Sequence, residues 1–105
     1  MGYAYYQFWE TSFSNYIWVN GNGSFYNPRH INFEKDTNQP ITVECYDYNR
    51  NYVGKVTTSS GYHWKQADLS WLPRGKSYRI KLVNAGSGTV RLRQGQVAHE
   101  DMIIA

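Results

Sequence analysis

The sequence has a single cysteine, few charged residues and no apolar run near the roughly 20 residues of a membrane-spanning helix. One cysteine excludes an intrachain disulfide. Leu, Ala and Glu, the usual helix-forming residues, are scarce, whereas Tyr, Trp, Val, Ile and Thr are common and favour strands. Aromatic residues make up 17% of the chain and charged residues only 18%, which argues against disorder. The 105 residues therefore suggest one ordered domain, 1–105, that needs neither metal nor disulfide to fold.

Short segments with apolar and polar residues in alternation lie between clusters of turn-forming Gly, Asn, Asp, Ser and Pro. This pattern predicts strands at 5–10, 16–19, 24–26, 30–34, 41–48, 52–57, 78–84 and 89–94. No segment has a convincing 3.6-residue stripe, although 67–72 is long enough for one helical turn. The prediction is an all-β, single-domain antiparallel β-sandwich, jelly-roll-like, with about eight short strands, and a small β-barrel is the alternative.

The two ends of the chain depart from this pattern. Residues 98–105 break the alternation and are predicted to form either a mobile tail or a late edge strand. Met1 and Gly2 fit residues added ahead of a mature chain, and no basic segment followed by an apolar stretch, as in a signal peptide, begins the sequence. We expect a secreted protein whose signal peptide is not part of this chain, and a cytoplasmic location is the alternative.

Residues with catalytic or metal-binding chemistry are sparse. Cys45 alternates with two aliphatic residues, so we predict a buried, unreactive core position. His30, His63 and His99 have separations that fit no zinc motif. The sequence contains no Gly-x-Ser-x-Gly, phosphate-binding or dinucleotide-binding motif. We therefore expect no enzyme activity, no metal site and no cofactor.

Three segments carry a resemblance to a known kind of module. ITVECYDYNRNYVG at 41–54 resembles a strand, D-x-N-G-x turn and strand hairpin, LPRGKSYRIKLVN at 72–84 is similar to L-x-x-G-x-Y-x-I-x-V, and GSGTVRL at 86–92 resembles a closing strand. Bacterial pre-peptidase C-terminal domains and related jelly-roll carbohydrate modules share this layout. The resemblance covers residues 30–97 and departs from the pattern at Asn51, where Gly is usual, and at Ser77, an extra residue. It implies an extracellular bacterial accessory or binding role and names no ligand residues.

A stretch without acidic residues contains six basic ones: Arg74, Lys76, Arg79, Lys81, Arg91 and Arg93. Strand alternation points the last four of these outward. We predict that the turn at 85–88 joins their two strands as neighbours, so that four cations share one sheet face. Such a face either resists edge-to-edge aggregation or binds an anion, for which nucleic acid, teichoic-type polymers, acidic glycans and anionic lipid headgroups are the candidates.

Aromatic residues form a second candidate surface. Tyr46 and Tyr48 are predicted to lie opposite the Cys45 face of their strand, and Trp64 flanks an irregular stretch where it could line a groove. These rings either stack on sugars or bases or pack within the protein. The candidate ligand-binding residues are Arg74, Lys76, Arg79, Lys81, Arg91, Arg93, Tyr46, Tyr48 and Trp64.

These observations predict a small non-catalytic extracellular bacterial protein that binds an anionic or glycan-rich surface through a basic sheet face and exposed aromatic residues. One alternative is a secreted antimicrobial or toxin-like effector that acts at bacterial membranes, for which the same composition would serve. A second is a barrel resembling an OB-fold that binds single-stranded nucleic acid. The expected partners are an anionic polymer, a glycan or a membrane surface, with nucleic acid ranked below them, and the oligomeric state stays open.

Overall fold

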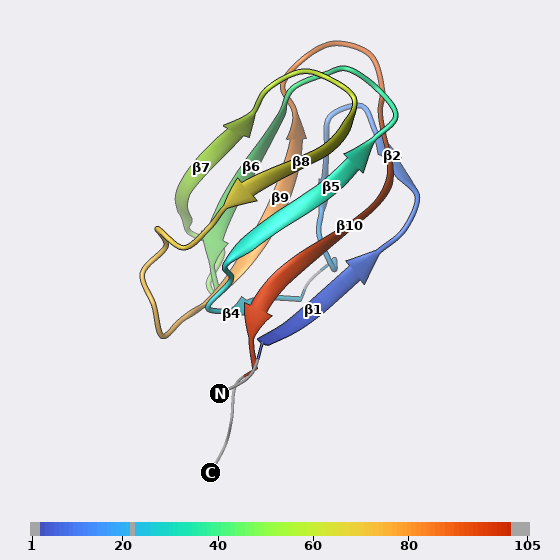
Figure 1. Ribbon diagram of the computed structural model, residues 1–105. Helices are drawn as coiled ribbons and strands as arrows, with labels where there is room; N and C mark the ends of the chain where they lie inside the picture. Colours follow the sequence, from blue (N-terminus) through green and yellow to red (C-terminus); the bar gives the residue numbers. More distant parts are fainter. Residues whose placement is uncertain (1–2, 22, 102–105) are drawn as a thin grey trace.

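The computed structural model describes residues 3–21 and 23–101, and within these ranges the chain forms ten strands and no helix (Figure 1). The strands are β1 (Tyr3–Phe8), β2 (Thr11–Phe13), β3 (Tyr16–Trp18), β4 (Phe25–Tyr26), β5 (His30–Lys35), β6 (Ile41–Asp47), β7 (Tyr52–Thr58), β8 (His63–Asp68), β9 (Ser77–Asn84) and β10 (Val90–Glu100). Within the same ranges the chain offers no helix that could cross a membrane.

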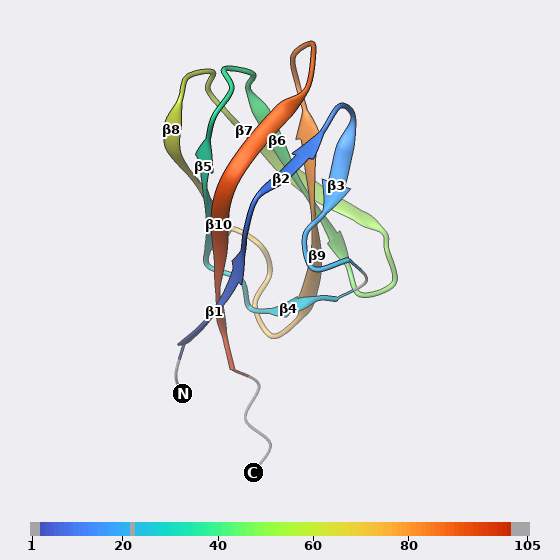
Figure 2. The same cartoon turned by 90° about the vertical axis from the view of Figure 1, so that its right-hand side faces the viewer.

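The strands form two antiparallel sheets that face each other (Figure 2). Sheet A has the order β1-β10-β5-β8, and β2 also pairs with β10. Sheet B has the order β3-β9-β6-β7, and β4 also pairs with β9. The predicted antiparallel β-sandwich is therefore confirmed, since the described strands belong to two separate sheets and not to one closed barrel.

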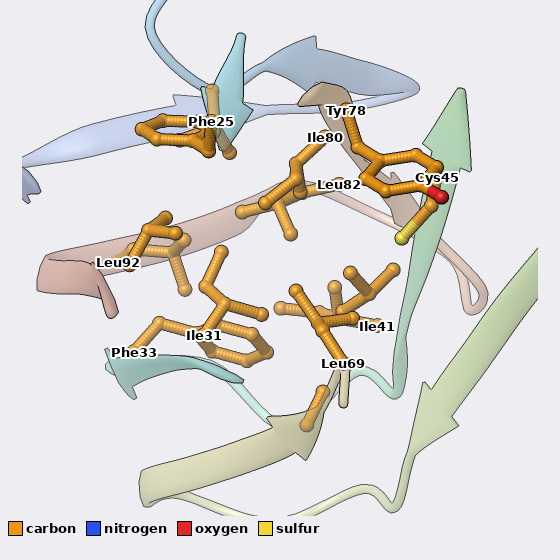
Figure 3. Packing of buried hydrophobic residues seen from close by; sticks show 14 of the residues in the cluster. Phe25, Ile31, Phe33, Ile41, Cys45, Leu69, Tyr78, Ile80, Leu82 and Leu92 are labelled. Atoms are coloured by element: carbon orange, nitrogen blue, oxygen red, sulfur yellow. The ribbon is translucent and has the colours of Figure 1, made fainter. Parts of the chain in front are cut away.

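The core fills the space between the two sheets (Figure 3). Ile31 and Phe33 of β5 enter it from sheet A, and Ile80 and Leu82 of β9 enter it from sheet B, all fully buried. Burial of one such side chain contributes about 1.5–3 kcal/mol. Cys45 of β6 is fully buried in the same cluster, which confirms the core position that its alternation predicted. Because these inward positions alternate with outward ones, the core also determines which side chains each sheet presents to solvent.

Strands β2 and β8 are missing from the sequence prediction. β8 lies at the edge of sheet A, and within it only Ala67 is fully buried, so it lacks the apolar alternation that marks the other strands. The helical turn expected at 67–72 is replaced by the end of this strand and a single turn, in which the Leu72 N–H donates to the Leu69 carbonyl at 3.1 Å. Both leucines are buried because this turn folds over the end of the core.

The C-terminal segment differs from its prediction as well. β10 runs to Glu100 and lies between β1 and β5, where Ala98 pairs with Tyr5 on one side and His30 on the other. Residues 98–100 are therefore part of an interior strand, neither a tail nor an edge. Residues 102–105, and Met1 and Gly2 at the other end, lie outside the described residues.

The prediction that β9 and β10 are neighbours in one sheet is wrong. β9 pairs with β3, β4 and β6 in sheet B, whereas β10 pairs with β1, β2 and β5 in sheet A. Residues 85–89 carry the chain from one sheet to the other, as Figure 1 shows. Side chains that point outward from β9 and from β10 therefore leave opposite sides of the sandwich. A turn rich in Gly and Ser reverses the chain in either arrangement, so its sequence does not distinguish a hairpin from a crossover.

Candidate functional site

Aromatic side chains gather on the outer face of sheet B, from β3, β6, β7 and the turn after β6: Tyr16, Trp18, Tyr46, Tyr52 and Tyr48. Trp18 pairs with Lys81, and Tyr46 pairs with Arg79. These two β9 residues alternate with Ile80 and Leu82, which point into the core, so the rings in register with them point outward. Tyr16, Tyr48 and Tyr52 are 49%, 65% and 54% exposed, so their rings are accessible to a ligand.

Three of these rings form a continuous row across the sheet. Trp18 and Tyr46 lie edge to face with ring centres 5.0 Å apart, although β9 separates their strands. Tyr46 and Tyr52 follow in the same manner at 5.7 Å. Pairs of this geometry contribute about 0.5–1.5 kcal/mol beyond their burial. The row therefore holds its own shape and presents an ordered apolar strip to solvent.

Two cations of β9 lie among these rings. The Lys81 Nζ is 4.1 Å from the centre of the Tyr16 ring and within 5.5 Å and 5.8 Å of the Trp18 and Tyr46 rings. The Arg79 guanidinium carbon is 5.3 Å from the Tyr48 ring, and its Nε–H donates to the Tyr48 carbonyl at 3.3 Å. These distances are those of cation–π contacts. We call the five aromatic residues with Lys81 and Arg79 the aromatic–cation face.

A carboxylate in the middle of this face modifies its electrostatics. Glu44 lies 3.9 Å from the Lys81 Nζ and accepts a hydrogen bond from the Tyr46 hydroxyl at 2.8 Å. Partial burial, followed by this hydrogen bond and the charge of Glu44, raises the pKa of Tyr46 to about 12. The Tyr46 hydroxyl therefore stays protonated and donates to Glu44 at neutral pH. Glu44 also lies opposite the exposed Lys55 in the strand register, so its charge offsets part of the positive charge of this face.

A shallow hollow of about 470 Å³ adjoins the Tyr48 end of the face and is lined by Asp47, Tyr48, Asn49, Lys76 and Ser77. The turn above it is held by Asp47, whose carboxylate accepts the Asn51 N–H at 2.9 Å. This hydrogen bond is the largest cause of a lowered pKa at Asp47. Asp47 therefore stays ionised beside Lys76, and the turn places Tyr48 over the edge of the hollow.

Five of the nine predicted ligand-binding residues come together at this site. Tyr46, Tyr48, Arg79 and Lys81 share the aromatic–cation face, and Lys76 lines the adjoining hollow. Tyr16, Trp18 and Tyr52 also belong to the face but were not among the nine predicted residues. The alternation of Tyr16 and Trp18 about Ile17 was a usable signal, but only the pairing of β3 with β9 brings them beside Lys81.

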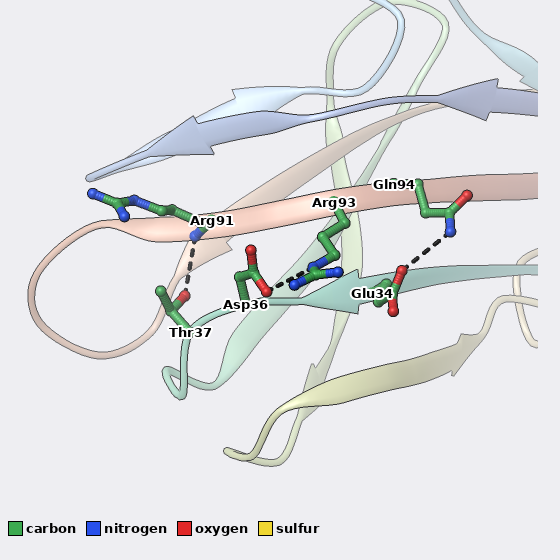
Figure 4. A network of polar contacts seen from close by, with 6 residues as sticks. All are labelled: Glu34, Asp36, Thr37, Arg91, Arg93 and Gln94. Atoms are coloured by element: carbon green, nitrogen blue, oxygen red, sulfur yellow. Dashed lines mark hydrogen bonds and ion pairs between the residues drawn. The ribbon is translucent and has the colours of Figure 1, made fainter.

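Arg91, Arg93 and Trp64 lie on the outer face of sheet A, away from the predicted cluster. The Arg93 Nε is 2.8 Å from the Asp36 carboxylate, and the Arg91 backbone N–H donates to Thr37 Oγ1 at 3.0 Å (Figure 4). Both arginines line a polar hollow of about 530 Å³ together with the carboxylates of Asp36 and Glu10. The predicted basic face of four cations is therefore not formed, because Arg79 and Lys81 belong to sheet B whereas Arg91 and Arg93 belong to sheet A.

Arg74 has a structural environment. Its guanidinium donates to the backbone carbonyls of Leu72 at 2.9 Å, Pro28 at 3.1 Å and Leu69 at 3.2 Å. A planar guanidinium with several N–H donors suits such multiple contacts. These bonds tie the loop that follows β8 to the segment that precedes β5, so Arg74 supports the fold at the end of the sandwich.

Comparison with known proteins adds no relative to this picture: no family model matches the chain, and no curated protein matches it in sequence. Across residues 3–21 and 23–101, no group of three or more His, Cys, Asp or Glu side chains is arranged to hold a metal ion. The aromatic–cation face is the candidate site because exposed rings and cations lie together there, and this arrangement can stack on a ligand ring with cations beside it.

Proposed function

We propose that this protein is a non-catalytic binding module, secreted by a bacterium, that attaches to an anionic glycan through the aromatic–cation face. The observation that carries the proposal is the edge-to-face row of Trp18, Tyr46 and Tyr52, with Lys81 and Arg79 packed beside it. The extracellular bacterial setting rests on the resemblance of residues 30–97 to pre-peptidase C-terminal domains and jelly-roll carbohydrate modules.

The typical free energies of ion pairs and of ring stacking indicate which groups of this face supply most of the binding affinity. An exposed ion pair contributes about 1 kcal/mol or less. Stacking of a ligand ring on an aromatic side chain contributes about 1–3 kcal/mol when the ligand is a nucleobase, and a sugar ring uses the same flat apolar area. We therefore assign affinity chiefly to the rings, and assign the preference for carboxylate or sulfate groups to Lys55, Arg79 and Lys81.

The decisive experiment compares two double variants that remove the same charge from opposite faces. Lys55→Gln with Arg79→Gln alters sheet B, and Arg91→Gln with Arg93→Gln is the matched control on sheet A. Binding to polygalacturonate and dextran sulfate is measured by titration calorimetry, with uncharged dextran for comparison. The sheet B pair should weaken binding to both anionic polymers about tenfold, whereas the control pair should change it less than about twofold.

A third variant separates stacking from charge. Tyr52→Ala removes an exposed ring without altering the net charge and should weaken binding by about tenfold or more, as expected for a stacking contact of about 1–3 kcal/mol. Equal weakening by the two charge pairs would mean that only net charge matters, and would contradict the proposal. Leakage from vesicles of anionic lipid, with no binding to the two polymers, would favour a membrane effector instead.

A further inference from the structure

An uncharged array of side chains crosses the outer face of sheet A. The strand register places Gln7 of β1 opposite Gln96 of β10, Gln96 opposite Asn32 of β5, and Asn32 opposite Gln66 of β8. We call these four residues the carboxamide row. Neighbouring strands lie about 4.8 Å apart, so the row extends roughly 14 Å. That length suits a short oligosaccharide laid across the strands.

The row faces solvent because its strand neighbours occupy the core. Ile31 and Phe33 flank Asn32 and are fully buried, and Val97 beside Gln96 is fully buried as well. Side chains alternate between the two faces of a strand, so the carboxamides point outward. The two residues at the ends of the row, on edge strands β1 and β8, are exposed, and the two in its middle are half-buried.

One acceptor in the row has no hydrogen-bond donor. The Asn32 Oδ1 is shielded from solvent and has no partner among the described residues. The adjacent row is satisfied by contrast, since Gln94 donates to Glu34 at 3.1 Å, the pair drawn in Figure 4, and Gln7 donates to Gln94 at 3.4 Å. A buried acceptor without a donor is unfavourable. A turn of the half-buried Asn32 side chain toward solvent would allow a ligand hydroxyl above the middle of the row to supply the missing donor.

Two aromatic rings flank the row on opposite edge strands. Tyr5 of β1, paired with Ala98, is 62% exposed, and Trp64 of β8, paired with Glu34, is 48% exposed. Both rings point outward in the rows next to the carboxamides, one on each side. The flat apolar rings of Tyr5 and Trp64 can stack on sugar rings, while the carboxamide row between them forms hydrogen bonds with the sugar hydroxyls.

We propose that the carboxamide row, with Tyr5 and Trp64, binds a neutral hexose chain. A carboxamide both donates and accepts hydrogen bonds, as sugar hydroxyls do, and it carries no charge. Glu34, in the row next to the carboxamides, disfavours an anion there. This site lies on the opposite side of the sandwich from the aromatic–cation face and is independent of it. With both sites filled, one molecule would join a neutral polymer to an anionic one.

The test uses cellohexaose, laminarihexaose and mannohexaose as neutral probes, measured by titration calorimetry on the full chain. We expect binding to at least one of them, and Gln7→Ala with Gln66→Ala should weaken it about tenfold. Both residues are exposed, so the fold should persist, and a thermal unfolding curve checks this. The control is Lys55→Gln with Arg79→Gln, which should bind the neutral probe as the parent does.

Three results would overturn the inference. The first is no binding of any of the three probes at millimolar concentration. The second is unchanged binding by Gln7→Ala with Gln66→Ala. The third is a concentration-dependent dimer that the same double variant abolishes, since the row would then be a contact between two copies. Binding to polygalacturonate is scored separately on the same variants, so failure here and failure of the proposed function are distinguishable.

Discussion

The pH dependence of stability provides a test of how the core is built around Cys45. Burial of the thiol, and to a lesser extent the charge of Glu44, raises the pKa of Cys45 to about 12 from an ordinary value near 9.0. Below pH 9.0 the thiol is protonated in both the folded and the unfolded chain. Between that pH and the folded pKa of about 12, only the unfolded chain releases the proton. The stability that this group contributes is therefore lost as pH rises through that window.

The magnitude follows from the size of the shift. Each pH unit above the unfolded pKa costs about 1.4 kcal/mol, so the loss reaches about 4 kcal/mol once the pH equals the folded pKa. Cys45→Ala removes the titrating group and also a buried sulfur, which costs about 1–2 kcal/mol at every pH. The variant should therefore be less stable than the parent at pH 8 and as stable as the parent at about pH 10–10.5.

The assay is urea unfolding followed by tryptophan fluorescence, in a reducing buffer, at half-unit steps from about pH 8 to about pH 10.5. Tyrosines and lysines titrate in the same range, but both proteins contain them, so the difference between the two free energies of unfolding isolates Cys45. A difference that stays constant across the range would refute the reasoning. Rapid reaction of the native thiol with a labelling reagent would refute it independently.

Two further predictions concern the backbone, and both are measured by thermal unfolding. Arg74→Ala should lower the free energy of unfolding by about 1–3 kcal/mol, because three backbone carbonyls, two after β8 and one before β5, lose their donor. Lys76→Ala in the same loop is the matched control and should change it by less than about 0.5 kcal/mol. Gly95→Ala should destabilise by about 1–3 kcal/mol, because the added Cβ would lie 2.7 Å from the Asn32 carbonyl oxygen and overlap the Phe8 ring. Alanine usually improves on glycine inside a strand, so a more stable Gly95→Ala would show that this close approach is absent.

The elements that the sequence predicted well are those with a strong local signal. Tyr78, Ile80 and Leu82 alternate with polar residues over one strand, so both the strand and its buried face followed from the pattern. The same holds for Cys45 in β6. β8 was missed because an edge strand buries only Ala67 fully and therefore has no apolar alternation to detect.

The candidate site was predicted in part for the same reason. Outward positions for Arg79 and Arg91 follow from alternation alone, and both side chains do face outward. Their grouping required knowledge of which strands are neighbours, and the turn between β9 and β10 carries no such information. The structure places the two arginines on opposite sheets. It also brings together Trp18 and Tyr46, two residues that are far apart in the sequence.

By itself, the sequence determined the fold class and, for strands with apolar alternation such as β5, β6 and β9, which side is buried, because these depend on the chemistry of residues within a few positions of one another. Only the tertiary structure decided which side chains from different strands lie together on the outer face of each sheet. The row of Gln7, Gln96, Asn32 and Gln66 draws one residue from each of four strands, and no local pattern marks it. The order of strands in a sheet is set by how the two sheets together bury their apolar faces, which is a property of the whole chain.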